Sequence, residues 1–382
     1  MVYFDNSATT FIKPQNVKNA VFKALNLYSL NPGRGSYEAA LKTEEEIYKV
    51  RKEVSDFFGG YGAENTVFLN SCTAALNQVL FGLLKEGDHC VISDLEHNAV
   101  LRPLSELKKR GVQFTVAETF PGDNDKTVDS FRKAINKNTK LIVCTAASNV
   151  WGIRLPFERI AALCKLYDIK ICVDASQAAG IIPINMKESM VDFLCFPAHK
   201  GLYGITGLGV LMLKENETLS PLIYGGTGVN SISESQPEKP PERYESGTLN
   251  VAGILALGEG IKFVKSKGIK NIHKYETEKL RFLYGYLEKR KDITLYTKKP
   301  DTENFVPVLS FNTNLSSEET VKLYSNFGIA LRGGLHCAPL AHKKFGTENK
   351  GAVRISPSVF TNERETEYFV RVSDKVLKSN YK

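Results

Sequence analysis

The sequence predicts an α/β protein with a large domain on a mainly parallel sheet and a smaller α+β domain. Short, nearly continuous apolar runs alternate with helical patterns through most of the chain, which is typical of parallel strands that helices cover on both faces. From about residue 265 the pattern changes to long helices mixed with a few strands. Since single cores stop growing near ~250–300 residues, a chain of 382 residues is expected to form two unequal domains.

The composition excludes several classes of protein. The net charge of +8 comes from scattered lysines and arginines, without the basic blocks or interleaved aromatics that nucleic-acid binding needs. The N-terminus lacks the basic start and apolar core of a signal peptide, and no apolar run approaches the ~20 residues of a membrane span. Seven cysteines without metal-site spacing favour a reducing compartment. We therefore expect a cytoplasmic protein without a metal site, nucleic-acid partner or membrane contact.

The first 70 residues are predicted to pass from loop to helix to strand. Residues 1–36 read as loop-rich because 31–36 is a cluster of turn residues. Apolar side chains recur at helical spacing over 37–58, which predicts an amphipathic helix. A strand expected at 66–69 then turns into a helix through small hydroxyl residues. Such a junction leaves unpaired backbone N–H groups and a positive dipole end, a site for an anion such as phosphate.

The alternation of strands and helices continues to about residue 173. Further strands are expected at 89–93, 112–117, 141–145 and 169–173, and helices at 99–110, 128–135 and 157–167. Ligands bind at the carboxyl ends of parallel strands. The polar residues just past these ends are therefore candidates for a site, and they are Glu96, His97, Asn98, Ser148, Asn149, Asp174, Ser176, Gln177 and the residues around Lys200.

The second half of the chain is predicted to leave the sheet and form the smaller domain. Extended loops at 224–230 and 236–243 lead to a helix at 251–264. Helices then follow at 272–288, 318–327 and 365–377, with strands at 306–311, 329–332 and 353–356. We expect the large domain to span 15–260, and the small domain to combine 1–14 with 261–382.

Lys200 is the first candidate for catalysis. It follows His199 directly, beyond the apolar run 192–196 and before a Gly-rich stretch. If apolar neighbours desolvate this lysine, its ammonium loses a proton more easily, which a Schiff base to a carbonyl cofactor requires. With 50 lysines and arginines in the chain, a solvated lysine is the commoner alternative. Other parts of the chain must decide between the two.

Four further residues have side chains suited to such a reaction. Asp174 at a strand end either pairs with a protonated pyridine nitrogen or caps a helix. His97 titrates near neutral pH and can move protons, unless it is only structural. Arg354 has a planar fork that binds carboxylate bidentately, or forms a surface ion pair. Cys337 stands in a Gly-rich loop, where a thiolate is accessible.

Four motifs in order carry a resemblance to a known family: Ser-Asn-Val-Trp-Gly at 148–152, Val-Asp-Ala-Ser-Gln at 173–177, Ala-His-Lys at 198–200 and Arg-Gly-Gly-Leu-His-Cys-Ala-Pro at 332–339. With them the chain resembles the class V, fold type I pyridoxal-phosphate enzymes, and among these the cysteine desulfurases with a short catalytic loop. The resemblance implies a large domain with a mainly parallel, seven-stranded sheet, and pyridoxal 5'-phosphate as cofactor. It also implies conversion of L-cysteine to L-alanine, with the sulfur left on Cys337 as a persulfide.

The resemblance also implies roles for individual residues. Lys200 would bond to the cofactor, Asp174 would pair with its ring nitrogen, and His97 would lie over the ring. Gln177 and Asn149 would hydrogen-bond the ring hydroxyl. The phosphate would rest on Cys72, Thr73 and His199, and on Thr248 of the facing subunit of a homodimer. Arg354 would clamp the substrate carboxylate. Asn149, Arg332 and, at the site rim, Arg34 are further substrate-binding candidates.

The chain departs from the family pattern at two positions, and other functions remain alternatives. Pro197 stands where many desulfurases have serine, and Cys72 where they have threonine, so two hydroxyl donors near the phosphate are lost. The alternatives are a selenocysteine lyase, another class V aminotransferase-type reaction, or a non-catalytic relative that binds only cofactor or a partner. A dinucleotide-binding enzyme is poorly supported because no Gly-x-Gly-x-x-Gly follows the first strand. A desulfurase also implies a sulfur-acceptor protein as partner.

Overall fold

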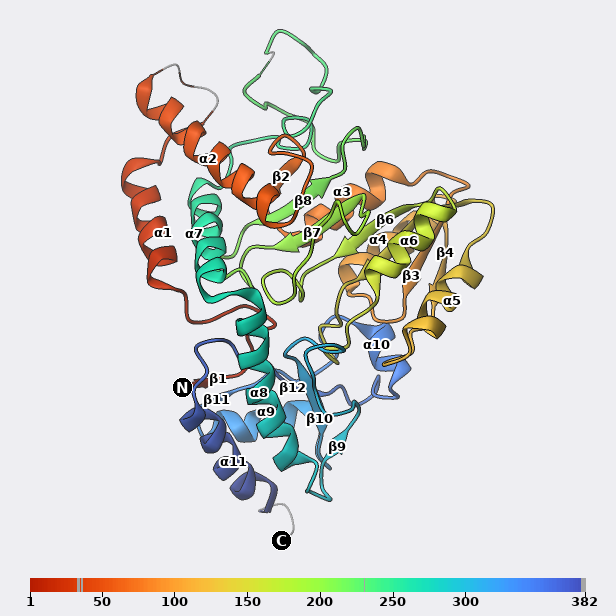
Figure 1. Ribbon diagram of the computed structural model, residues 1–382, viewed down its shortest axis with the longest axis vertical. Helices are drawn as coiled ribbons and strands as arrows, with labels where there is room; N and C mark the ends of the chain where they lie inside the picture. The colour runs from red at the N-terminus through yellow and green to blue at the C-terminus, as the bar shows by residue number, and fades with distance from the viewer. Residues whose placement is uncertain (33–34, 36, 230, 379–382) are drawn as a thin grey trace.

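A seven-stranded sheet forms the centre of the computed structural model, which describes residues 1–32, 35, 37–229 and 231–378 (Figure 1). Its strand order is β2-β8-β7-β6-β5-β3-β4. The strands are β2 (Thr66–Leu69), β3 (His89–Ser93), β4 (Gln113–Ala117), β5 (Thr139–Thr145), β6 (Lys170–Asp174), β7 (Phe193–Pro197) and β8 (Gly209–Leu213). All run in one direction except β8, which is antiparallel to both its neighbours. The prediction of a mainly parallel sheet is confirmed.

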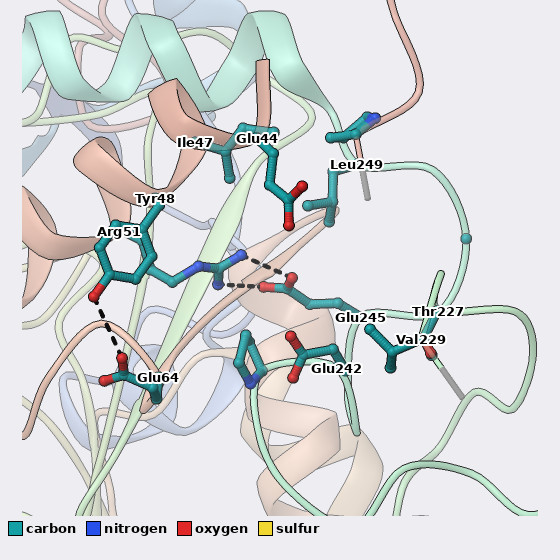
Figure 2. Close-up of a pocket in the computed structure, with 13 residues that line it drawn as sticks. Glu44, Ile47, Tyr48, Arg51, Glu64, Thr227, Val229, Glu242, Glu245 and Leu249 are labelled. Atoms are coloured by element: carbon teal, nitrogen blue, oxygen red, sulfur yellow. Dashed lines mark hydrogen bonds and ion pairs between the residues drawn. The ribbon is translucent and has the colours of Figure 1, made fainter. Parts of the chain in front are cut away.

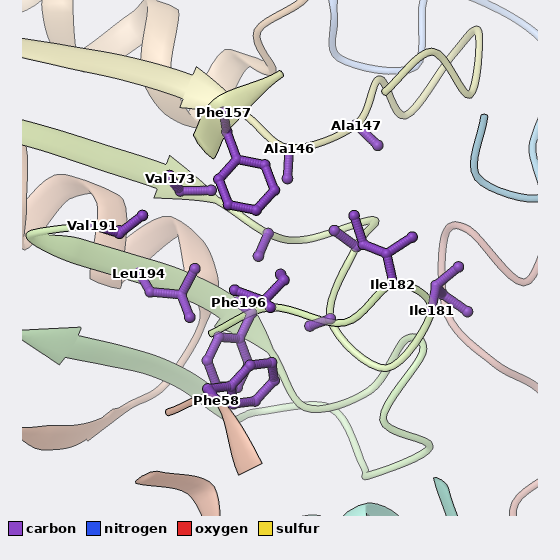
Figure 3. Packing of buried hydrophobic residues seen from close by; sticks show 14 of the residues in the cluster. Phe58, Ala146, Ala147, Phe157, Val173, Ile181, Ile182, Val191, Leu194 and Phe196 are labelled. Atoms are coloured by element: carbon purple, nitrogen blue, oxygen red, sulfur yellow. The ribbon is translucent and has the colours of Figure 1, made fainter. Parts of the chain in front are cut away.

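Alternation along the strands divides the core into two layers. In β7, Phe193 and Cys195 face one layer, whereas Leu194 and Phe196 face the other, because successive side chains of a strand point to opposite faces. Figure 3 shows the second layer, where Phe196 packs on Phe58 with ring centroids 4.4 Å apart. Burial on both faces is why these strands read as continuous apolar runs.

Helices cover both faces of this sheet (Figure 1). They are α2 (Glu38–Phe57), α3 (Cys72–Leu83), α4 (Asn98–Lys109), α5 (Asn124–Ala134), α6 (Phe157–Leu166) and α7 (Val251–Lys267). Each lies within a few residues of a helix that the apolar spacing predicts. In the part of the chain that the structure describes, no helix combines the length and the apolar character needed to cross a membrane.

The expectation of a loop over residues 1–36 is wrong for α1 (Gln15–Leu27). This helix packs beside α7 and buries Val17 and Ala24. Phe22 and Leu25 are exposed on its other side. Val17, Ala20, Val21 and Ala24 recur at helical spacing, but the exposed apolar side chains elsewhere on α1 obscure this stripe in the sequence.

The smaller domain contains a three-stranded antiparallel sheet, β12-β10-β9, and a two-stranded parallel one, β1-β11 (Figure 1). These strands are β1 (Val2–Tyr3), β9 (Thr294–Leu295), β10 (Leu309–Asn312), β11 (Ile329–Ala330) and β12 (Val353–Ile355). The helices beside them are α8 (Ile269–Leu287), α9 (Ser317–Ser325), α10 (Pro339–Lys344) and α11 (Glu363–Lys378). Pairing of β1 with β11 brings the N-terminus into this domain. The proposed boundary at residue 260 falls inside the continuous helix α7.

The strand expected at 306–311 begins only at Leu309. Residue Val306 donates its backbone N–H to the carbonyl of Gly152 at 2.8 Å, in the loop after β5. If β10 began at Val306, this N–H would be available to pair with a neighbouring strand, but it is already bonded to Gly152. The segment therefore joins the two domains beside the carboxyl ends of the large sheet.

Candidate functional site

A cavity of about 130 Å³ lies at the carboxyl ends of β2, β3, β5, β6 and β7. Nine of the residues predicted for a site line it together, and they are Cys72, Thr73, His97, Asn149, Asp174, Ser176, Gln177, His199 and Lys200. Pro197 lines it as well. Cys337, Arg354, Arg332 and Thr248 are not among the lining residues. Arg34 lies outside the residues that the structure describes.

The start of α3 forms a cradle for an anion at one end of the cavity. Ser71 caps this helix by accepting the N–H of Ala74 at 3.1 Å. The N–H groups of Cys72 and Thr73, in the first turn, have no partner within the helix. A Cβ on Gly209 would lie 2.1 Å from the carbonyl carbon of Ser71, so only glycine lets β8 pass this close. Free N–H groups at a helix start favour phosphate.

His199 adds a further polar group to this cavity. Its Nδ1 is buried and has no hydrogen-bond partner within the described chain. Burial, together with the nearby Lys200 and Lys13 ammonium groups, lowers its pKa to about 4. The ring is therefore neutral at pH 7. Because buried polar atoms normally have a hydrogen-bond partner, this free Nδ1 indicates that a ligand group binds here.

Asp174 is a buried carboxylate at the end of β6. Its Oδ1 accepts the N–H of Ser176 at 2.9 Å and lies 3.8 Å from the Cys72 thiol. No helix begins within 175–192, so Asp174 does not cap one. Burial and the Asp174 charge raise the pKa of Cys72 well above its usual range. Cys72 is thus a neutral thiol that donates to Asp174.

The Lys200 amine is in the environment that the sequence predicts for a reactive group. Burial lowers its pKa to about 8; the Asp174 charge opposes this shift, and Arg354 adds to it. Its Nζ makes no hydrogen bond or ion pair to any described residue. The backbone beside it is fixed, because the N–H of Thr10 donates to the His199 carbonyl at 3.1 Å.

His97 caps α4 with its ring. Nδ1 accepts the N–H of Ala99 at 3.0 Å, so the neutral ring carries its proton on Nε2. Burial lowers the pKa of His97, and the Asp174 charge partly opposes this. The preceding Glu96 is also buried, and it accepts the N–H of Thr145 at 2.8 Å. Burial raises the pKa of Glu96 to about 8.

Arg354 is buried, so the alternative of a surface ion pair is wrong. Only 1% of the residue is exposed. Nη2 donates to Asp5 Oδ1 at 2.6 Å, and Nη1 donates to the Asn149 carbonyl at 2.9 Å. Nε is buried without a partner among the described residues. Since guanidinium has five N–H donors, three remain for an anion. The backbone N–H of Arg354 donates to the backbone carbonyl of Arg332 at 2.8 Å.

Cys337 lies on an exposed loop, whereas the other six cysteines are buried. Its carbonyl accepts the N–H of Asn98 at 2.7 Å, and the preceding His336 carbonyl accepts Nδ2 of Asn149 at 2.8 Å. Asn98 begins the helix that His97 caps, and Asn149 lines the cavity. These bonds tie the Cys337 loop to the edge of the cavity.

Thr248 is exposed, and its neighbours Gly247 and Leu249 line a second cavity of about 190 Å³. Figure 2 shows this cavity. There Arg51 and Glu245 form a buried double hydrogen bond, of 2.6 and 2.9 Å. Glu245 also accepts the N–H of Phe68 at 2.6 Å, which pins the segment before Thr248 to β2. This pair was not identified from the sequence. Arg51 falls among the apolar positions of α2, next to Val50, and a charged residue there indicates a buried partner.

Glu276 of α8 is a buried carboxyl that the sequence reasoning also missed. Together with Lys200 and Gln177 it lines a cavity of about 30 Å³ behind the amine. Tyr203 donates its hydroxyl to Glu276 Oε1 at 3.1 Å. Burial raises the pKa of Glu276 to about 8.

We expect Glu276→Gln to stabilise the protein at alkaline pH. Between pH 4.5, the ordinary pKa, and about 8, the folded state keeps a proton that the unfolded state has released. The free energy of unfolding therefore falls as pH rises through this window. The variant lacks that loss, so its free energy of unfolding should exceed that of wild type by about 3–5 kcal/mol at pH 9 and match it near pH 4.5. Urea denaturation at both pH values measures this, and a pH-independent difference would contradict it.

Comparisons with known proteins agree with this geometry. A family model described as Aminotransferase class-V matches residues 2–369. A probable cysteine desulfurase of Methanothermobacter thermautotrophicus is 30% identical over 374 residues, which cover 95% of this chain and 92% of the relative. A cysteine desulfurase of Escherichia coli (strain K12 / DH10B) is 31% identical over 349 residues, which cover 88% and 84%.

Solved structures extend the likeness to the whole fold. The apo structure of cysteine desulfurase from Thermococcus onnurineus NA1 has a TM-score of 0.91 at 30% identity, covering 99% of this chain and 95% of that one. An Escherichia coli cysteine desulfurase in an S-sulfonic acid form has a TM-score of 0.88 at 24% identity, which supports the fold alone. Because the family match and these alignments run through nearly all of the chain, the protein belongs to the aminotransferase class-V family.

Proposed function

We propose that the protein is a pyridoxal 5'-phosphate-dependent cysteine desulfurase that converts L-cysteine to L-alanine and leaves the sulfur on Cys337. The observation that carries this proposal is the exposed Cys337 thiol on a loop bonded to Asn98, beside a cavity that contains a buried amine of lowered pKa. The names of the relatives at about 30% identity support the same activity.

The residues of the cavity fit the cofactor. The cradle at Cys72 and Thr73 suits its phosphate, and the unpartnered Nδ1 of His199 offers one further contact. Asp174 is placed to pair with a protonated ring nitrogen, and Lys200 is the amine for covalent attachment. Gln177 and Asn149 are the candidates for the ring hydroxyl. When bound, this cofactor withdraws electrons from an amino acid attached to it.

The substrate would be held by cationic groups at the domain boundary. The three remaining N–H donors of Arg354 suit an α-carboxylate. Asn149 positions this arginine through its carbonyl. Arg332 adds a second cation, and Arg34 is retained as a candidate for the rim. His97, neutral with its proton on Nε2, is suited to move protons above the ring.

The sulfur step needs no further oxidant. The Cys337 thiolate attacks the substrate sulfur, an S–S bond forms, and the C–S bond of cysteine breaks. The electron pair of that bond stays on the carbon, which takes up a proton to give alanine. One thiol and one cysteine thus yield one persulfide and one alanine. The loop exposure of Cys337 would also let an acceptor protein reach the sulfur.

The remaining proposals concern assembly and location. We propose a homodimer in which Thr248 of each subunit contacts the phosphate of the other. The exposure of Thr248, and the pinning of the segment before it by the Arg51–Glu245 pair, support this arrangement. Seven cysteines without a disulfide fit a reducing, cytoplasmic location.

The test is a mass measurement after treatment with cysteine. We expect the Cys337 peptide to gain one sulfur atom, and alanine to be released. Cys337→Ala should abolish both. Alanine release that survives this substitution would contradict the proposed sulfur step, and selenocysteine cleavage that survives it would favour a lyase. A wild-type protein that binds no pyridoxal 5'-phosphate would point to the non-catalytic alternative.

A further inference from the structure

Two buried histidines stand beside Cys337 and are absent from the chemistry described above. The rings of His336 and His342 are stacked at an interplanar angle of 9° with centroids 5.5 Å apart. Nδ1 of His336 lies 3.3 Å from Nε2 of His342. At the far end, Nδ1 of His342 lies 2.7 Å from Thr347 Oγ1. At the near end, Nε2 of His336 lies 3.4 Å from the Arg332 carbonyl.

These contacts are satisfied by one arrangement of protons on neutral rings. A carbonyl can only accept, so His336 Nε2 carries a hydrogen and Nδ1 must accept. His342 therefore donates from Nε2 and accepts at Nδ1. Thr347 donates its hydroxyl to this Nδ1 at 2.7 Å, which is closer than the other acceptor within reach, the His342 carbonyl at 3.3 Å. Burial keeps both rings neutral: it lowers the pKa of His342 to about 4 and that of His336 well below its usual range. The result is a directional chain from Thr347 through both rings to Arg332.

The chain ends at a carbonyl that also belongs to the substrate side of the site. The Arg332 carbonyl accepts two hydrogen bonds, one from the backbone N–H of Arg354 at 2.8 Å and one from His336 Nε2. The backbone carbonyl of His336 also accepts a hydrogen bond from Nδ2 of Asn149. The His336 ring thus anchors the residue before Cys337 between the Arg332 carbonyl and the His342 ring of α10.

The backbone at the thiol needs such an anchor. Both His336 and Cys337 have positive φ, +49° and +56°. For residues other than glycine this conformation costs on the order of 1 kcal/mol or more each, and it persists only where surrounding contacts enforce it. The buried ring of His336 supplies contacts that the exposed side chain of Cys337 lacks.

We propose that the Thr347–His342–His336 chain holds the Cys337 loop in the geometry required for sulfur transfer. His336, His342 and Thr347 are then positioning residues, and the proposal rests on the desulfurase function above. The physical reason is that a displacement of about 1 Å between reacting atoms can slow a reaction about 10²-fold.

The first test compares Thr347→Val with Thr347→Ser in the holoenzyme. Valine has the shape of threonine but removes the hydroxyl donor to His342, whereas serine keeps it. We expect valine to slow persulfide formation on Cys337 about 10-fold in a single turnover. The KM for cysteine and the cofactor absorbance should not change. Serine should stay within about 2-fold of wild type, on the scale of a conserved hydrogen bond.

A second pair of variants tests the middle of the chain. His342→Leu removes the donor to His336 and should slow persulfide formation about 10²-fold. His342→Gln places an amide N–H close to the lost Nε2 and should restore at least part of the rate. Equal rates in the leucine and glutamine variants would overturn the proposal.

A readout independent of activity is the hydrogen exchange of residues 333–338. The valine and leucine variants should exchange these amides about 10-fold faster than wild type, a loss of about 1.4 kcal/mol of local stability. The serine variant should not differ. Equal exchange in the valine and serine variants overturns the inference. If wild type forms no persulfide on Cys337, the desulfurase proposal fails, and the exchange comparison alone decides whether the chain holds the loop.

Discussion

Lys200→Ala is expected to lower alanine release at least about 10³-fold, the scale on which removal of a nucleophile or acid–base group acts. With a pKa of about 8, roughly a tenth of the Lys200 amines are neutral at pH 7, far more than for an ordinary lysine. Only the neutral amine can attach to the cofactor. The variant should also lose the visible absorption of the bound cofactor, which a spectrum of the purified protein measures.

Lys13→Ala is the matched control for this experiment. Burial also lowers the pKa of Lys13 to about 8, and its Nζ donates to Thr10 Oγ1 at 2.6 Å and to the His199 carbonyl at 3.2 Å. Lys13 does not line the main cavity. We expect this variant to keep the cofactor band. A band that disappears in Lys13→Ala and remains in Lys200→Ala would refute the assignment of Lys200.

The second large effect is expected for Arg354→Ala. Removing one partner of a buried ion pair costs about 3–5 kcal/mol, because the other partner is left without compensation. Here Asp5 would lose its 2.6 Å contact, and the Asn149 carbonyl would lose its donor. If Arg354 also binds the substrate carboxylate, kcat/KM for cysteine should fall about 10–100-fold, mainly through KM. Urea denaturation and steady-state kinetics measure the two effects separately.

Arg354→Lys distinguishes the charge from the fork of the guanidinium. Lysine keeps the positive charge near Asp5, but it cannot donate to Asp5, to Asn149 and to a carboxylate in one plane. We expect a smaller loss of stability than in the alanine variant and a similar rise in KM. A KM that stays at the wild-type value in both variants would limit Arg354 to a structural role.

The strands and the residues after them could be predicted because the information is local. In β2 and β3 the apolar runs are continuous, since both faces of the sheet are buried, and the expected bounds agree with the structure. His97 and Asp174 stand at strand ends or just beyond them, and parallel strands bring those ends together. Helix α1 was missed because its apolar side chains face both the core and the outside.

The sequence by itself determined the α/β class, the order of strands and helices, and which residues meet at the edge of the sheet. Only the tertiary structure decided which polar groups share a buried space. Arg354 meets Asp5 across 349 positions, and Arg51 meets Glu245 across 194. The pattern within a short window does not contain these pairings. Likewise, the sequence places His336 next to Cys337, but the direction of the chain through His342 follows from distances that only the folded protein has.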